Sequence, residues 1–235
     1  MRSRKYIFFS TPFYLTAALS LSAYIIADIL PQMHMRPGIR VLAVGIFCVF
    51  AYVGSRILCK TPLISKKKVM RVTFFIFFVS YLYLLLTFTL FDPMFGRSGY
   101  ESFIFSDRTL LKEYLSKSFN IIPFATIFEY INALLTRSMS ISAIVNNLLG
   151  NLLVLTPLAL FLPMFFQKCG RLRYFALYSA ATVAIIELLQ LVFVTGSCDI
   201  DDLILNVFGA CIAFVILKTN PVRRVVDMLI PGDDE

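Results

Sequence analysis

Six long apolar runs, separated by short basic or polar segments, constrain the fold of this 235-residue chain more than any other feature. Each run approaches the roughly 20 residues that a helix needs to cross the hydrocarbon core of a bilayer. Hydrophobic residues make up 59% of the chain and charged residues only 15%, which is far too apolar for a soluble domain. The sequence therefore predicts an all-α, polytopic transmembrane bundle with spans at residues 12–30, 39–58, 69–91, 147–166, 174–194 and 202–217.

The basic residues predict which way this bundle faces. Clusters of Lys and Arg precede the first run and follow the second, fourth and sixth runs, so all of them fall on one side of the predicted membrane. The positive-inside rule places that side, and with it both termini, in the cytoplasm. The net charge is +8, but the basic residues form no stripe interleaved with aromatic residues. A nucleic-acid partner is therefore not predicted.

The segment 92–146 is predicted to lie on the outer side and to divide in two. In its first half, Ser106 or Asp107 can cap a short helix that runs through Lys117. After Pro123, apolar residues recur at helical spacing, at Ile127, Phe128, Ile131, Leu134 and Leu135. This pattern predicts a helix near 124–136 that lies in the membrane interface or is re-entrant. A surface helix that packs on the bundle is the alternative.

Three aspartates, Asp199, Asp201 and Asp202, fall within four residues in the stretch GSCDIDDLILN, between the last two apolar runs. The last three spans also carry polar or small residues at helical spacing, namely Asn147, Gly150 and Asn151; Glu187 and Gln190; and Asp202, Asn206 and Gly209. A carboxylate at bilayer depth costs about 2.5–3.5 kcal/mol, so these faces are expected to meet one another.

The meeting of these faces predicts one outward-opening polar pocket. Its expected lining is Asn147, Asn151, Glu187, Gln190, Asp199, Asp201, Asp202 and Asn206, with Gly150 and Gly209 allowing close helix approach. We call the stretch that carries Asp199, Asp201 and Asp202 the acidic turn. In the alternative interpretation, the Asn and Gln side chains only join helices to one another, and the acidic turn is a solvated loop.

Three blocks of the sequence resemble, in order, the signature blocks of the VanZ-like family. They are FNIIPFATI (Phe119 to Ile127), NNLLGNLLVLTPLALFLP (Asn146 to Pro163) and ELLQLVFVTGSCDIDDLILNVFG (Glu187 to Gly209). The resemblance implies a VanZ-like domain at 119–217, preceded by a three-span addition at 1–91 and an extracytoplasmic segment at 92–118, and followed by a cytoplasmic tail at 218–235.

Site residues follow from the resemblance one by one. The family's motifs match Asn120, Pro123 and Phe124; Asn147, Gly150 and Asn151; Glu187 and Gln190; and Asp199, Asp201, Asp202, Asn206 and Gly209. The chain departs from the family at Ala125, where a lysine is common, and at Gly196 to Cys198, where some members carry an arginine. A role that needs a fixed cation just before the three aspartates is therefore not expected.

The resemblance implies a multi-pass protein of the bacterial cell membrane, with a role in reduced susceptibility to the lipoglycopeptide teicoplanin. The first hypothesis is that the pocket binds or modifies an outer-leaflet amphiphile, such as a lipoglycopeptide or a lipid-linked wall precursor. Ligand-binding candidates are Asn120, Asn147, Asn151, Glu187, Gln190, Asp199, Asp202 and Asn206, while Pro123, Gly150 and Gly209 are expected to be structural.

Two other functions remain open at this point. The alternative is a membrane enzyme in which Glu187, Asp199, Asp201 and Asp202 are the catalytic candidates. These carboxylates can share acid–base work or hold a hard divalent cation through oxygen ligands. An ion-coupled transporter is less favoured, because few polar residues continue toward the inner face in the fourth and fifth spans.

Overall fold

The computed structural model describes residues 2–29, 36–62, 64–91 and 108–230, and these are helical almost throughout. Six helices are long and apolar enough to cross a membrane, at Lys5–Ala27, Pro37–Leu58, Lys66–Leu90, Ile141–Phe165, Leu172–Phe193 and Ile200–Leu217. The predicted all-α, multi-pass membrane fold is thereby confirmed, while the side on which each terminus lies stays a prediction. The chain forms two compact units, one of Met1–Leu84 with Asn220–Glu235 and the other of Leu85–Thr219.

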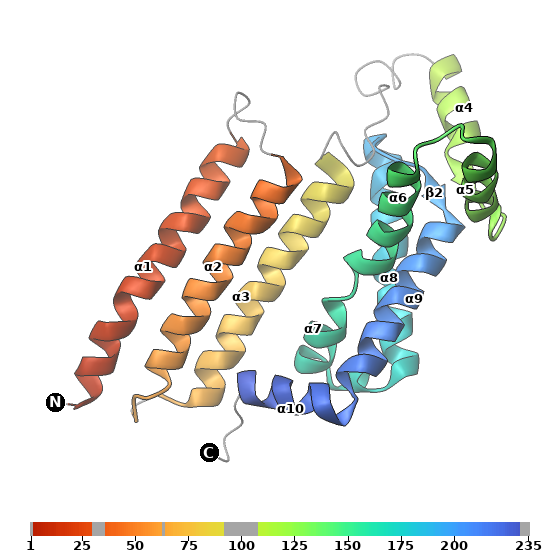
Figure 1. Cartoon of the computed structure of the whole chain (residues 1–235). Coiled ribbons are helices and arrows are strands. Elements are labelled where there is room, and N and C mark those ends of the chain that lie inside the picture. The colour runs from red at the N-terminus through yellow and green to blue at the C-terminus, as the bar shows by residue number, and fades with distance from the viewer. Residues whose placement is uncertain (1, 30–35, 63, 92–107, 231–235) are drawn as a thin grey trace. The chain divides into compact units, whose positions relative to one another are not determined.

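The first unit is built from three long helices that run side by side (Figure 1), α1 (Arg2–Ile29), α2 (Pro37–Leu58) and α3 (Lys66–Leu86), and from the short α10 (Asn220–Leu229). Ala17, Phe47 and Ala51 form a buried apolar core. The Ser55 hydroxyl lies 2.8 Å from the Tyr14 hydroxyl and 2.7 Å from the Thr73 hydroxyl, so one buried chain of hydroxyls joins the three long helices.

The second unit contains the remaining elements. In chain order these are the π-helix η1 (Thr87–Phe91), α4 (Arg108–Lys117), β1 (Phe119–Asn120), α5 (Ala125–Thr136), α6 (Ile141–Val154), α7 (Leu158–Phe165), η2 (Gln167–Gly170), α8 (Leu172–Phe193), β2 (Cys198–Asp199) and α9 (Ile200–Leu217). Helices α4 and α5 occur where the sequence predicts them, although Ser106 and Asp107, the expected caps of α4, lie outside the described residues.

The fourth span is broken into α6 and α7. Pro157 has no N–H to donate to the Leu153 carbonyl, which accepts the Thr156 N–H at 3.1 Å and the Thr156 hydroxyl at 2.7 Å instead. The span begins at Ile141, earlier than predicted, because Ser140 caps α6 by accepting the Ala143 N–H at 3.2 Å. Both halves of the broken span, α6 and α7, pack against α9.

Two short strands bring distant parts of the second unit together. β1 pairs in parallel with β2, with Phe119 opposite Cys198 and Asn120 opposite Asp199. The Cys198 N–H also donates to the Ser118 carbonyl at 2.7 Å. This pairing holds the segment that precedes α5 against the turn between α8 and α9.

Candidate functional site

The acidic turn begins where α8 ends in a strained residue. Val194 has φ 57°, a left-handed conformation that β-branched residues rarely adopt. Its side chain is only 1% exposed and packs against Tyr114 of α4. The Tyr114 hydroxyl donates to the Gly196 carbonyl at 2.6 Å. Packing and hydrogen bonding from α4 therefore hold the turn in place despite the strain at Val194.

Asp199 caps α9, and its side chain accepts three hydrogen bonds. Its Oδ1 accepts the Asp201 N–H at 2.9 Å and the Asn120 amide at 3.1 Å, and its Oδ2 accepts the Thr126 hydroxyl at 2.5 Å. The Asp199 N–H donates to Glu187 Oε2 at 3.2 Å. The side chains of Asp199 and Glu187 are 8% and 6% exposed, so both carboxyl groups lie largely inside the protein.

Asp201 is completely buried and caps a helix other than its own. Its Oδ1 accepts the Phe124 N–H at 2.5 Å, and its Oδ2 accepts the N–H groups of Thr126 and Ile127 at 2.9 and 3.3 Å. Phe124, at the start of α5, has φ 67° and offers no side-chain cap. A carboxylate satisfies the unpaired N–H groups there and complements the positive end of the helix dipole. Asp201 thus fixes α5 to the start of α9.

Asp202 stands apart from the other two aspartates because it is partly exposed. Its Oδ1 accepts a hydrogen bond from the Asn151 amide of α6, and its backbone carbonyl accepts the Asn206 amide at 2.7 Å. Among the residues that the structure describes, no Lys or Arg forms an ion pair with Asp202, Glu187 or the other two carboxylates. A cationic ligand therefore meets no competing Lys or Arg at Asp202, although the Asn151 amide already occupies Oδ1.

A tyrosine extends this polar region along α5. The Tyr130 hydroxyl accepts a hydrogen bond from the Asn147 amide of α6 at 3.1 Å. Burial raises the pKa of Tyr130 above its usual value. The hydrogen bond with Asn147 lowers this pKa in part, while the charges of Asp202 and Asp199 raise it further. The hydroxyl therefore stays protonated at neutral pH and remains a donor to any group that binds beside Asp202.

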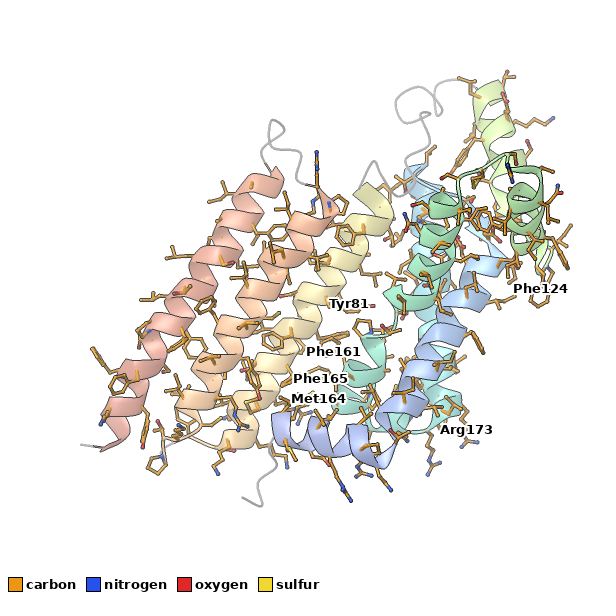
Figure 2. All side chains as sticks on the ribbon, in the orientation of Figure 1. Tyr81, Phe124, Phe161, Met164, Phe165 and Arg173 are labelled. Atoms are coloured by element: carbon orange, nitrogen blue, oxygen red, sulfur yellow. The ribbon has the colours of Figure 1, made fainter. Side chains whose placement is uncertain are left out.

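The surface beside these polar groups is apolar and exposed. No residue of α5 is buried. Its apolar side chains and those of the preceding loop form what we call the α5 face, which consists of Ile121, Ile122, Phe124, Phe128, Ile131, Leu134 and Leu135. In Figure 2, Phe124 lies on the outer flank of the second unit beside α5, and Arg173 lies toward the end where α8 begins. The α5 face is thus a hydrophobic surface adjoining a polar one.

The described residues contain no group of three or more His, Cys, Asp or Glu side chains arranged to hold a metal ion. Cys198 lies close to the carboxylates. Burial raises the pKa of its thiol, and the charges of Glu187 and Asp199 raise it further. The thiol therefore stays protonated and is a poor nucleophile.

The structure brings together most of the residues predicted for the site, and many of their polar groups are hydrogen-bonded within the protein. Asn120, Glu187, Asp199, Asp201 and Asn206 are engaged in the hydrogen bonds described above or are buried. Gln190 faces elsewhere, since its amide donates to the Thr89 carbonyl of η1 at 3.0 Å. The expectation that all eight residues line one opening stays a prediction. Of the eight, Asn147 is exposed, and Asn151, Gln190 and Asp202 are half-buried.

Some features of the site were not predicted from the sequence. Thr126, Tyr130 and Tyr114 lie among the polar groups, and their positions depend on α4 and α5 folding back onto the acidic turn. The two glycines also differ. A Cβ on Gly209 would overlap the Leu152 carbonyl oxygen, so α6 and α9 approach closely there. Gly150 is exposed and a Cβ on it would meet no described atom within 4 Å, so the expected close approach at that position is wrong.

This geometry defines a multi-pass helical membrane protein in which an acidic turn between two spans anchors an exposed, apolar helix. Comparison with protein families identifies the group to which it belongs. The model of the VanZ/LLP1 family matches residues 75–222, more than half of the chain, and the protein belongs to the VanZ-like family. No curated protein and no solved structure matches the chain significantly. The family match extends from α3 into α10.

Proposed function

We propose that this VanZ-like protein acts in the bacterial cell envelope and lowers susceptibility to teicoplanin by binding an outer-leaflet amphiphile at Asp202 and the α5 face. The observation that carries the proposal is the junction of two unlike surfaces. The partly exposed Asp202 adjoins Asn151, and the seven apolar residues of the α5 face lie on α5 and on the loop before it, which the acidic turn anchors. A molecule with a polar head and an acyl chain matches both surfaces.

The roles of the individual groups follow from their contacts. Asp202 and the Tyr130 hydroxyl offer an acceptor and a donor to the polar head, while the α5 face receives the chain. Buried Asp199 and Asp201 position these groups through α5 and α9 rather than binding the ligand themselves. A carboxylate enzyme stays the alternative function, and in it Glu187 and Asp202 are the remaining acid–base candidates.

An Asp202→Asn variant tests the polar half of the proposal. Asn can still accept the Asn151 hydrogen bond through its own Oδ1, so the fold is expected to persist while the ionisable group is lost. Since a hydrogen bond to a charged group contributes about 1.5–3 kcal/mol, we expect protection against teicoplanin to fall by about tenfold. The measurement is the inhibitory concentration of teicoplanin and of vancomycin in a sensitive Gram-positive host at equal membrane expression.

The matched control is Asp227→Asn, which removes an exposed carboxylate of α10 that forms a surface ion pair with Arg223. It is expected to protect as the wild type does. Vancomycin lacks the acyl chain, so its inhibitory concentration should change little with any variant. Equal teicoplanin concentrations for the wild type and the empty vector would refute the proposed function.

A Phe128→Ser/Leu135→Ser variant tests the apolar half. Both side chains are exposed, at 67% and 77%, so the substitutions remove apolar surface without opening a cavity. Burial of two large apolar side chains against an acyl chain is worth about 3 kcal/mol or more, and we expect teicoplanin protection to be largely lost. The control is Leu15→Ser/Leu19→Ser in α1, where the side chains are 59% and 71% exposed. If both variants lose protection equally, α5 has no specific role.

A further inference from the structure

A cavity lies at the end of the first unit that carries the turn between α2 and α3. Its volume is about 480 Å³, and its lining comes from the last turns of α2, the residues that follow it and the first residue of α3. The lining residues are Tyr52, Val53, Arg56, Ile57, Cys59, Lys60 and Lys66. None of them belongs to the acidic turn or to the α5 face.

Among the residues that the structure describes, the charged groups that line the cavity are all cations. Arg56, Lys60 and Lys66 supply three cations, and no Asp or Glu is among the lining residues. The guanidinium of Arg56 donates to the Met228 carbonyl at 3.2 Å through one nitrogen. Because a guanidinium carries five N–H donors, others remain for a ligand. Arg and Lys together form the usual binding set for phosphate groups.

The wall of the cavity is held in place by contacts at both helix ends. The Cys59 thiol donates to the Lys66 carbonyl at 3.8 Å, which ties the end of α2 to the start of α3. The Tyr52 hydroxyl donates to the Leu229 carbonyl at 3.1 Å, so the C-terminal end of α10 is fixed at the cavity as well. The cations are therefore presented by a braced turn that contacts α10.

The surroundings of the cavity favour a lipid over a soluble anion. Val53 and Ile57 contribute apolar wall, and Val49, one turn earlier on α2, is 61% exposed. α10 carries Arg223 and Arg224 as well as exposed Val225, Met228 and Leu229. Such an amphipathic, basic helix is typical of segments that lie in the membrane interface. A headgroup phosphate at the cations would leave its acyl chains beside the exposed side chains of α2.

We infer that this cavity binds the phosphate headgroup of an anionic phospholipid from the leaflet on the Lys- and Arg-rich side of the membrane, with Arg56, Lys60 and Lys66 around the phosphate. This site is separate from the proposed amphiphile site and does not depend on it. Basic pockets beside transmembrane helices recognise anionic headgroups through the same combination of cations and apolar wall.

The test compares lipid retention by the full-length protein in a neutral detergent, measured by native mass spectrometry with added dioleoyl phosphatidylglycerol or dioleoyl phosphatidylcholine. The pocket variant is Lys60→Gln/Lys66→Gln, which leaves the Arg56 and Tyr52 bonds to α10 intact. We expect the wild type to retain phosphatidylglycerol in preference to phosphatidylcholine. We expect the affinity of the pocket variant for phosphatidylglycerol to fall by about tenfold or more, because each of the two lost cations contributes to the free energy of binding an anionic lipid.

Two controls make the result specific. Lys168→Gln/Arg171→Gln removes two exposed cations from the second unit and should bind as the wild type does. Lys60→Arg/Lys66→Arg keeps the positive charge at both positions and should retain phosphatidylglycerol. Retention by this variant would show that the loss in the Gln variant comes from the missing charge and not from substitution at these positions as such. The inference is overturned if the pocket variant retains phosphatidylglycerol as the wild type does, or if phosphatidylcholine is retained equally. Displacement of the lipid by millimolar inorganic phosphate would also overturn it and assign the site to a free anion.

Discussion

Replacing Asp201 with Asn is expected to release α5 from the acidic turn and to destabilise the protein strongly. In the wild type, one carboxyl oxygen accepts the Phe124 N–H and the other accepts the N–H groups of Thr126 and Ile127. Asn has a single acceptor oxygen, so its amide must face at least one of these donors. The side chain is completely buried, and water cannot replace the lost partner.

The expected cost is about 3 kcal/mol, because each hydrogen bond to a buried charged acceptor contributes about 1.5–3 kcal/mol and an unpaired donor adds its desolvation penalty. Hydrogen–deuterium exchange is the direct measurement. The amides of Phe124, Thr126 and Ile127 should lose most of their protection, while those of α2 in the first unit should keep theirs. Unfolding in mixed micelles gives the accompanying change in stability.

Asp227→Asn serves as the control for the same chemical change at an exposed carboxylate of α10. An exposed ion pair contributes little, so stability should change by less than about 1 kcal/mol. Unchanged exchange at Phe124, Thr126 and Ile127 in the Asp201 variant would show that α5 is held by something other than this cap. Asp201→Asn should also lower teicoplanin protection under the proposed function, since Asp201 positions the α5 face.

The membrane class and the six spans could be predicted from the sequence because both depend on local quantities. Hydrophobic length alone decides whether a helix can cross a bilayer, and the six observed spans overlap the six predicted ones. The start of α6 was missed by several residues because the prediction began the span at Asn147 and gave no weight to Ser140 as an N-cap before Ile141. The break at Pro157 was also missed, although a proline in a helix interior predicts a kink or a break in that helix.

The site was harder to predict because it depends on contacts between distant segments. Helical spacing correctly groups residues on one face of a single helix, but it does not say which polar atoms pair across helices. The carboxylate of Asp201 caps α5 by accepting the N–H of Thr126, and these two residues are 75 positions apart in the chain. That pairing requires the β1–β2 contact and the left-handed Phe124, neither of which leaves a hydropathy signal. The cluster of aspartates in the sequence indicated where the site lies. Only the tertiary contacts distinguish the residues that hold the site together from those that a ligand can reach.

Gly209→Ala is the second substitution with a large expected effect, and it acts through packing between α6 and α9. A Cβ at this position would overlap the Leu152 carbonyl oxygen, which belongs to the backbone and cannot rotate away as a side chain can. The two helices must therefore separate, and Asn151, the neighbour of Leu152, must then shift relative to Asp202. Overpacking of this kind costs about 1–3 kcal/mol, and a backbone clash lies at the upper end of that range.

Gly150→Ala in α6 is the matched control because it makes the same change inside a helix of the same unit. A Cβ there meets no described atom within 4 Å. Ala is favoured over Gly in a helix interior by about 1 kcal/mol, so this variant is expected to be slightly more stable than the wild type. The two substitutions should thus change the free energy of unfolding in opposite directions. A Gly209→Ala protein as stable as Gly150→Ala would mean that α6 and α9 do not meet at Leu152, and that Asn151 reaches Asp202 by another arrangement.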